Sequence, residues 1–525
     1  MNYCELVTKV RKYHRLSLLC LISEVNAKLW TNQKIDISSN LGKAYLTHRA
    51  YGSRIAVISA ATGNDHHHSY PSEKDMLNLS HFYLEIKERI ADEGIIKKDF
   101  FTLIEAIGNT CLKDFSLDEG CLKICSVKIF FMRLLRSQYE HVTFKPTGIE
   151  RSWAIFKEYI KKNNNAEYDK VRNYLKIDPL HVLRSGYGFI ALSEDKKTQW
   201  GKINTNLSNI DIKVREVYQI DNDVLNLIAK RWSRTFAGFR EWHDKVVLQE
   251  DEYFRKYVPS PLVQTPLIDL EGNHDYLLPS PWHLAWRMKD VLFESLQRIH
   301  ENTTERELLN TSLGEALEDV LEDELIYYFG IDKVIRIDKI QSDNTRPKAD
   351  FVLVDSGYAI IVEVKKSIGG VNSKVHAQID DIVKMWDKLV VASKQCSGTL
   401  HSDYFQSIRN KYNIKKVVTL VCIGDDLVSE SGIFLFFAYG CNLISQIDLQ
   451  YHDIFSVDEF DELISSFTIP ELTKAIIDRW NTYKTGSDID AQSSMYYRNI
   501  LRDKKSYSQE SFYKNLAEEI MPIEE

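Results

Sequence analysis

Two carboxylates and a lysine stand at a fixed spacing around a predicted tight turn. Asp350 begins one run of β-branched and aromatic residues, and Glu363-Val364-Lys365 ends the next run. The two runs flank Ser356-Gly357, a pair that is typical of a two-residue hairpin turn. Counting back from this turn along both strands, Asp350 faces Glu363, so that two acids lie side by side.

Like charges that face each other on one side of an antiparallel strand pair are destabilising, because their Cβ atoms lie roughly 4.5–5.5 Å apart. Both faces of this hairpin are apolar, which is typical of a covered hairpin, and Lys365 supplies only one positive charge. Hard cations such as Mg²⁺ bind carboxylate oxygens. The pattern therefore predicts a divalent metal ion between Asp350 and Glu363. The alternative is a structural hairpin whose ends reach solvent, with Lys365 paired to one acid.

The elements around the hairpin follow from hydrophobic periodicity. A helix is expected over residues 313–325 with Gly330 as its stop, and a second helix over residues 375–390. Short strands are expected over residues 333–338, 417–423 and 433–437. With the hairpin included, the predicted order is helix, three strands, helix and strand.

This order, with Asp350 at the start of the second strand and Glu-x-Lys on the third, resembles the PD-(D/E)XK superfamily of restriction-endonuclease-like nucleases. Members of that superfamily commonly carry another acid on the first helix, which Glu318 matches with Glu315 as its rival. Several groups carry a glutamine on the second helix, which Gln378 matches. The sequence departs from the motif at Ala349, which stands where the name-giving proline precedes the aspartate.

The resemblance covers about residues 305–440 and implies metal-assisted hydrolysis of a phosphodiester. Asp350 and Glu363, with the carbonyl of Val364, would hold Mg²⁺ or Mn²⁺, which polarises the phosphoryl oxygen and lowers the pKa of a bound water. Lys365 would orient or deprotonate that water and offset charge that develops on phosphorus.

The resemblance gives two further residues a role. Glu318 would complete the metal coordination or help to place a second ion, and Gln378 would position Lys365 or the scissile phosphate. The alternatives are that Glu318 belongs to a solvated acidic helix face and that Gln378 is a surface amide.

Length, composition and net charge limit the number of domains and the way in which a nucleic acid could bind. The 525 residues exceed what one core holds, and 44% hydrophobic and 27% charged residues are typical of a globular protein. A net charge of −8 excludes a generally basic surface, so a nucleic acid must meet a local patch. The candidate basic residues are Lys365, Lys366, Lys374, Lys384, Lys388, Arg409, Lys411, Lys415 and Lys416.

The predicted fold class is α+β with several domains. A mainly helical recognition or partner domain is expected over residues 1–258, with a small hairpin between residues 187–192 and 210–218. A proline-rich arm and connecting helix follow over residues 259–300. The nuclease-like α/β core spans residues 301–445, and a helical extension spans residues 446–525.

The predicted function is a metal-dependent endonuclease acting on DNA. A large helical region joined through a proline-rich arm to such a core resembles bacterial proteins of defence and mobile-element loci. This resemblance implies the nuclease of an anti-phage defence or restriction system. The alternatives are an RNase with the same site and an inactive nucleic-acid-binding or scaffold subunit. Cutting both strands would need a homodimer or higher assembly. No GxxxxGK[ST] motif occurs, so ATP-driven movement would need a separate ATPase or helicase subunit, and a trigger would need a sensor subunit.

No signal peptide and no apolar run of membrane-spanning length is predicted, so no membrane partner is expected. The eight cysteines form no CxxC pair, which argues against a zinc finger. Reduced thiols in a cytoplasmic protein are the expectation.

Overall fold

The structure is a computed structural model, and it describes most of the chain. The described residues are 2–31, 39–66, 69–88, 93–127, 129, 148–163, 165–194, 201–205, 217–250, 255–258, 260–271, 274–300, 302–337, 348–366, 379–424, 449–485, 496–497, 500–501 and 511–521.

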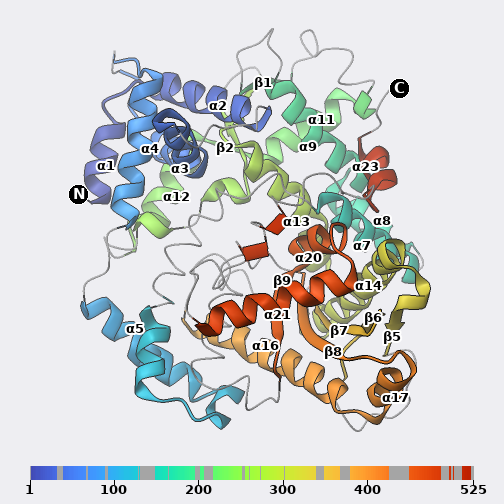
Figure 1. The fold of residues 1–525 in the computed structure, drawn as a ribbon. Coiled ribbons are helices and arrows are strands. Elements are labelled where there is room, and N and C mark those ends of the chain that lie inside the picture. Colours follow the sequence, from blue (N-terminus) through green and yellow to red (C-terminus); the bar gives the residue numbers. More distant parts are fainter. Residues whose placement is uncertain are drawn as a thin grey trace. The chain divides into compact units, whose positions relative to one another are not determined.

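The protein is α+β, with a mainly helical first half followed by a mixed sheet with helices (Figure 1). It divides into two compact units. The first contains the described residues within Met1–Ile90, Leu134–Thr303 and Asn515–Glu525. The second contains those within Ala91–Arg133 and Thr304–Lys514. These units differ from the four predicted segments. Helix α5 (Glu93–Ile107) lies in the segment predicted over residues 1–258, but it packs on α16 (Ile379–Leu400) and belongs to the second unit.

The first unit is built mainly from helices. They are α1 (Tyr3–Val10), α2 (Arg15–Thr31), α3 (Asn40–Thr62), α4 (Glu73–Glu88), α7 (Ile149–Lys162), α8 (Ala166–Leu175), α9 (Pro179–Ser193), α11 (Asn222–Trp232), α12 (Phe236–Trp242), α13 (Pro281–Ile299) and α23 (Lys514–Ile520), with the single turns η2 (His243–Val247), η3 (Arg255–Tyr257) and η4 (Pro261–Val263).

A small sheet completes the first unit, with the strand order β1-β4-β3-β2. Its strands are β1 (Lys202–Asn204), β2 (Ser233–Thr235), β3 (Leu267–Asp269) and β4 (Asp275–Leu277). The predicted proline-rich arm thus contains two strands of this sheet. A buried apolar core unites α1 to α4 with residues of α12, β3, β4 and the start of α13.

The second unit holds the predicted hairpin. Its helices are α5, α14 (Thr303–Phe329), α16, α17 (Asp403–Lys411), α20 (Val457–Ile464) and α21 (Ile469–Thr485), with the short turns η1 (Cys111–Asp114) and η5 (Ile331–Lys333). Its strands are β5 (Val334–Arg336), β6 (Phe351–Asp355), β7 (Tyr358–Lys365), β8 (Lys416–Ile423) and β9 (His452–Ser456).

The five strands form one mixed sheet in the order β5-β6-β7-β8-β9. Strands β5, β6 and β7 pair antiparallel, and β8 and β9 continue the sheet in parallel with β7. The hairpin register runs from Asp355 opposite Tyr358 to Phe351 opposite Val362, as the two-residue turn predicted. Ser356 and Gly357 have φ values of 49° and 81°, the left-handed conformation that such turns require.

Two helices cover opposite faces of this sheet, and β9 shows which helix lies on which face. Successive residues of a strand point to opposite faces. The His452 side chain bonds to Ser393 of α16, whereas its neighbour Asp453 pairs with Arg479 of α21. Helix α16 therefore covers one face and α21 covers the other.

The structure corrects two expectations. Residues 187–192, predicted as a strand, lie within α9, because Asp178 caps Leu180 and Pro179 starts a helix there. The segment after residue 446, predicted as helical, supplies the edge strand β9 as well as helices. The strand predicted over residues 433–437 lies outside the described residues.

Within the described ranges, no helix is both long and apolar enough to span a bilayer. Cys4, Cys20, Cys125, Cys396 and Cys422 are free thiols. Cys121 is part of a disulfide, whereas reduced thiols were expected. The spacing of scattered cysteines along the chain carries no information on which of them pair.

Candidate active site

Glu363 lies near the end of β7 with its side chain sealed from solvent. The residue is 0% exposed, and the other residues of β7 are also buried except at the two ends of the strand. Its Oε1 contacts the Lys365 ammonium, and its Oε2 has no hydrogen-bond partner among the described residues. Burial, and then the charge of Asp350, raise the pKa of Glu363 well above its usual value. A buried, ionised carboxylate with an unsatisfied oxygen is costly, so Glu363 either holds a proton or binds a cation.

Asp350 lies one residue before β6 and binds β7 on both sides of Glu363. Its backbone N–H donates to the Val362 carbonyl at 3.1 Å. Its Oδ2 accepts the Val364 N–H at 2.6 Å. These two contacts hold the Asp350 carboxylate beside Glu363, which explains its effect on the Glu363 pKa. The predicted juxtaposition of the two acids is therefore present, with Asp350 just beyond the last regular strand pair.

Lys365 follows Glu363 by two residues, so both side chains lie on one face of β7. This is the α16 face, because Ile361 on the same face pairs with Thr419, whose hydroxyl contacts the His452 ring. Its side chain is 31% exposed, whereas that of Glu363 is 1% exposed. The ammonium group thus reaches from the buried acid toward solvent. Lys366, on the other face, donates to Asn310 of α14 at 3.0 Å.

Glu318 on α14 is held in an ion cluster. Arg336 of β5, 7% exposed, donates to Glu318 at 3.1 Å and to Glu322 at 2.9 Å, and also contacts Asp319. These acids are therefore paired, and not merely a solvated helix face. The charge of Glu318 still raises the pKa of Glu363, more weakly than Asp350 does. A role for Glu318 in metal binding stays a prediction, as does one for the Val364 carbonyl.

Gln378 lies outside the described residues, as does Lys374 of the predicted basic patch. The exposed basic run from Arg409 to Lys416 is not near Lys365. Lys416 pairs with Tyr358, seven residues from Lys365 along β7, which at strand rise is about 23 Å.

Helix α16 supplies groups near the acids that the sequence pattern did not single out. Thr399 Oγ1 accepts the Ala349 N–H at 2.7 Å, and Gln395 donates to the Lys348 carbonyl at 3.2 Å. The Cys396 thiol is fully buried, and its pKa is raised by burial and then by Glu363 and Asp350. The apolar stripe of this helix, continued past Val390, reaches Cys396 at helical spacing, so this signal was present in the sequence.

We expect Thr399→Val to move Asp350 without touching the acids. The substitution keeps the shape of the side chain but leaves the buried Ala349 N–H without its acceptor, which costs about 1–3 kcal/mol. Thermal unfolding should show this loss, and metal affinity should fall with it. Thr311→Val is the matched control, since Thr311 is exposed and its hydroxyl donates to the Glu307 carbonyl within the same helix, α14. Equal effects of the two substitutions would contradict a positioning role for Thr399.

The donor set suits a hard divalent ion. Asp350 and Glu363 offer carboxylate oxygens, and Glu363 Oε2 is buried without a protein partner in the described part of the chain. No cluster of three or more His, Cys, Asp or Glu side chains with metal-binding geometry occurs in the described ranges. An ion here would therefore rest on two carboxylates, with the remaining coordination from backbone oxygen or water, as is common for Mg²⁺.

No known protein family, curated protein or solved structure matches this chain. The interpretation of the candidate site therefore depends on the geometry described above.

Proposed function

We propose that this protein is a divalent-metal-dependent nuclease that hydrolyses phosphodiester bonds of DNA, with its site at the open end of the β6–β7 hairpin. The observation that carries the proposal is the environment of Glu363, a buried acid with an oxygen that has no hydrogen-bond partner among the described residues. Asp350 bonds the backbone of Val362 and Val364 on both sides of it, and Lys365 contacts its other oxygen. The strand order β5-β6-β7-β8-β9 between α16 and α21 also supports a restriction-endonuclease-like core.

The chain's own residues have distinct parts in this proposal. Asp350 and Glu363 would hold Mg²⁺ or Mn²⁺, which when bound supplies Lewis-acid polarisation of the phosphodiester. The partly exposed Lys365 ammonium is placed to orient the attacking water and to offset charge on the phosphoryl oxygens. In its neutral amine form, Lys365 would instead accept a proton from that water. The covered sheet behind Glu363 lowers the local dielectric and so strengthens these interactions.

The proposal is tested by incubating purified full-length protein with plasmid DNA and with single-stranded RNA, in Mg²⁺, Mn²⁺ or EDTA. We expect DNA cleavage that requires the metal. Cleavage of RNA alone would assign an RNase, and cleavage that persists in EDTA would contradict a metal site. Silence on both substrates, together with no effect of either metal on thermal stability, would favour the scaffold alternative.

A further inference from the structure

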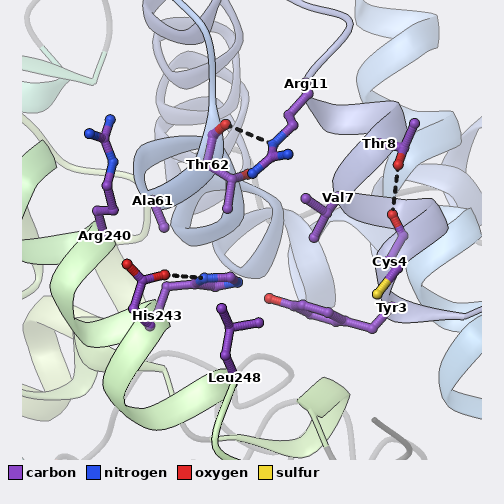
Figure 2. Close-up of a pocket in the computed structure, with 11 residues that line it drawn as sticks. Tyr3, Cys4, Val7, Thr8, Arg11, Ala61, Thr62, Arg240, His243 and Leu248 are labelled. Atoms are coloured by element: carbon purple, nitrogen blue, oxygen red, sulfur yellow. Dashed lines mark hydrogen bonds and ion pairs between the residues drawn. The ribbon is translucent and has the colours of Figure 1, made fainter.

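A cavity of about 460 Å³ lies within the first unit, apart from the proposed nuclease site. It is bordered by the start and end of α1, the end of α3, and the junction of α12 with η2 (Figure 2). Its volume falls in the range of roughly 300–1,000 Å³ typical of small-molecule sites. The residues that matter below are Tyr3, Arg11, Thr62, Arg240, His243 and Asp244.

His243 lines this cavity and carries a buried ring nitrogen that has no partner in the described part of the chain. The residue is 6% exposed, and its Nε2 has no hydrogen-bond partner among the described residues. Its Nδ1 lies 3.5 Å from Asp244 Oδ1, and its ring stacks on Tyr3 with centroids 6.1 Å apart. Figure 2 shows the ring directed from η2 toward Tyr3 and Val7. With Nδ1–H assigned toward Asp244, Nε2 is an acceptor for a ligand donor.

The backbone at His243 is also unusual. The Leu248 N–H donates to the His243 carbonyl at 3.0 Å, which closes a π-helical turn over His243–Val247. Such turns are rare and frequently occur at functional sites. Here the turn follows directly on α12 and so places both His243 and Leu248 in the wall of the cavity.

The cavity carries an excess of positive charge. Arg11 and Arg240 both border it, and Arg11 Nε is anchored to the Thr62 carbonyl at 3.1 Å. Burial first, and then Arg11 and Arg255, lower the pKa of His243, while Asp244 opposes them. Asp244 is the single carboxylate among the described lining residues. Because at least two arginines face one acid, a dianion complements this charge better than a monocarboxylate does.

We propose that this cavity binds a phosphomonoester with hydroxyl or amino donors, of the size of a mononucleotide. The phosphate is neutralised by Arg11 and Arg240, since guanidinium groups bind phosphate through charge-assisted hydrogen bonds. A hydroxyl or amino group of the ligand donates to His243 Nε2 and satisfies that buried atom. This proposal does not depend on the nuclease function.

The test is calorimetric titration of the full-length protein with AMP, inorganic phosphate and acetate, in EDTA so that the proposed metal site takes no part. We expect AMP to bind, phosphate to bind more weakly, and acetate not to bind. Arg240→Gln and His243→Phe should each weaken AMP binding about tenfold, as expected for the loss of one charge-assisted contact or one buried hydrogen bond. Arg231→Gln, which changes an exposed arginine of α11, is the matched control and should bind AMP like the wild type.

The proposal would be overturned by no AMP binding at millimolar concentration, by equal binding of acetate, or by unchanged AMP binding in both variants. Arg240 is exposed, so Arg240→Gln should fold even if His243→Phe does not. Loss of AMP binding in Lys365→Ala but not in Arg240→Gln would place the ligand at the β6–β7 hairpin and would also refute the cavity. Failure of the nuclease proposal would leave these outcomes unaffected, because no cleavage is measured.

Discussion

Replacing Lys365 with alanine should lower the rate of metal-dependent DNA cleavage by about 100- to 10,000-fold at pH 7. This range is typical for the loss of a general acid–base group or of a positioned charge in a site. The loss should appear in the maximal rate and not only in the substrate concentration that gives half of this rate. The reason is that the Lys365 ammonium lies against Glu363 and, in the proposed function, would act at the reacting phosphate. Single-turnover cleavage of a labelled duplex measures it.

Two companion variants separate the possible roles of Lys365. Lys366→Ala removes the same charge one residue further along, from a side chain that bonds Asn310, and should change the rate by less than about tenfold. Lys365→Arg keeps the charge but cannot give up its proton. Partial activity in Lys365→Arg would indicate an electrostatic role, and full loss would indicate proton transfer. Wild-type rates in Lys365→Ala would show that Lys365 takes no part in catalysis.

Replacing Asp453 with asparagine should destabilise the second unit by about 3–5 kcal/mol, the usual cost of breaking a buried ion pair from one side. Both oxygens of Asp453 lie 2.6 Å from Arg479 Nη1, and Tyr497 also donates to this acid. Asp453 and Arg479 are 0% and 1% exposed. Burial alone would lower the pKa of Arg479, but Asp453 and then Tyr497 raise it, so the guanidinium stays charged. Without Asp453, that charge is buried with too little compensation.

Urea denaturation followed by tryptophan fluorescence measures this loss, since Trp480 donates to the His452 carbonyl beside Asp453. Asp478→Asn removes an exposed acid from the same helix α21 and should cost less than about 0.5 kcal/mol. The double variant Asp453→Leu with Arg479→Met should lose less than Asp453→Asn alone, because no charge is left buried. An unchanged urea midpoint for Asp453→Asn would show that the pair does not anchor β9.

The hairpin and the positions of its two acids were predictable because the register of a hairpin depends on the residues of its turn, which are local in the sequence. A two-residue turn fixes the register of every pair that follows it, and Ser356-Gly357 identified the turn. The apolar composition of both faces indicated a covered hairpin, and the structure buries both faces. The ion cluster of Glu318 was not predictable, because Glu318 lies on helix α14 and its partner Arg336 lies on strand β5.

Strand β9 was missed for a related reason. Its sequence begins with His452 and Asp453, which look exposed, but each finds a buried partner far along the chain: Ser393 for the histidine and Arg479 for the acid. Long-range pairing of this kind leaves no periodic signal. At α9, in contrast, a local signal existed, since Asp178-Pro179 marks a helix start eight residues before the alternation that suggested a strand.

The most direct test of the proposed site is the binding of Mn²⁺ to full-length protein by calorimetry at several pH values, beside Glu363→Gln. Burial and Asp350 raise the pKa of Glu363, so the metal-free acid holds a proton that the ion must displace. We therefore expect Mn²⁺ affinity to rise with pH, by at most about tenfold per pH unit below the raised pKa, with proton release. Glu363→Gln should abolish this binding. Mn²⁺ binding that is independent of pH, or that persists unchanged in Glu363→Gln, would contradict a metal site at this hairpin.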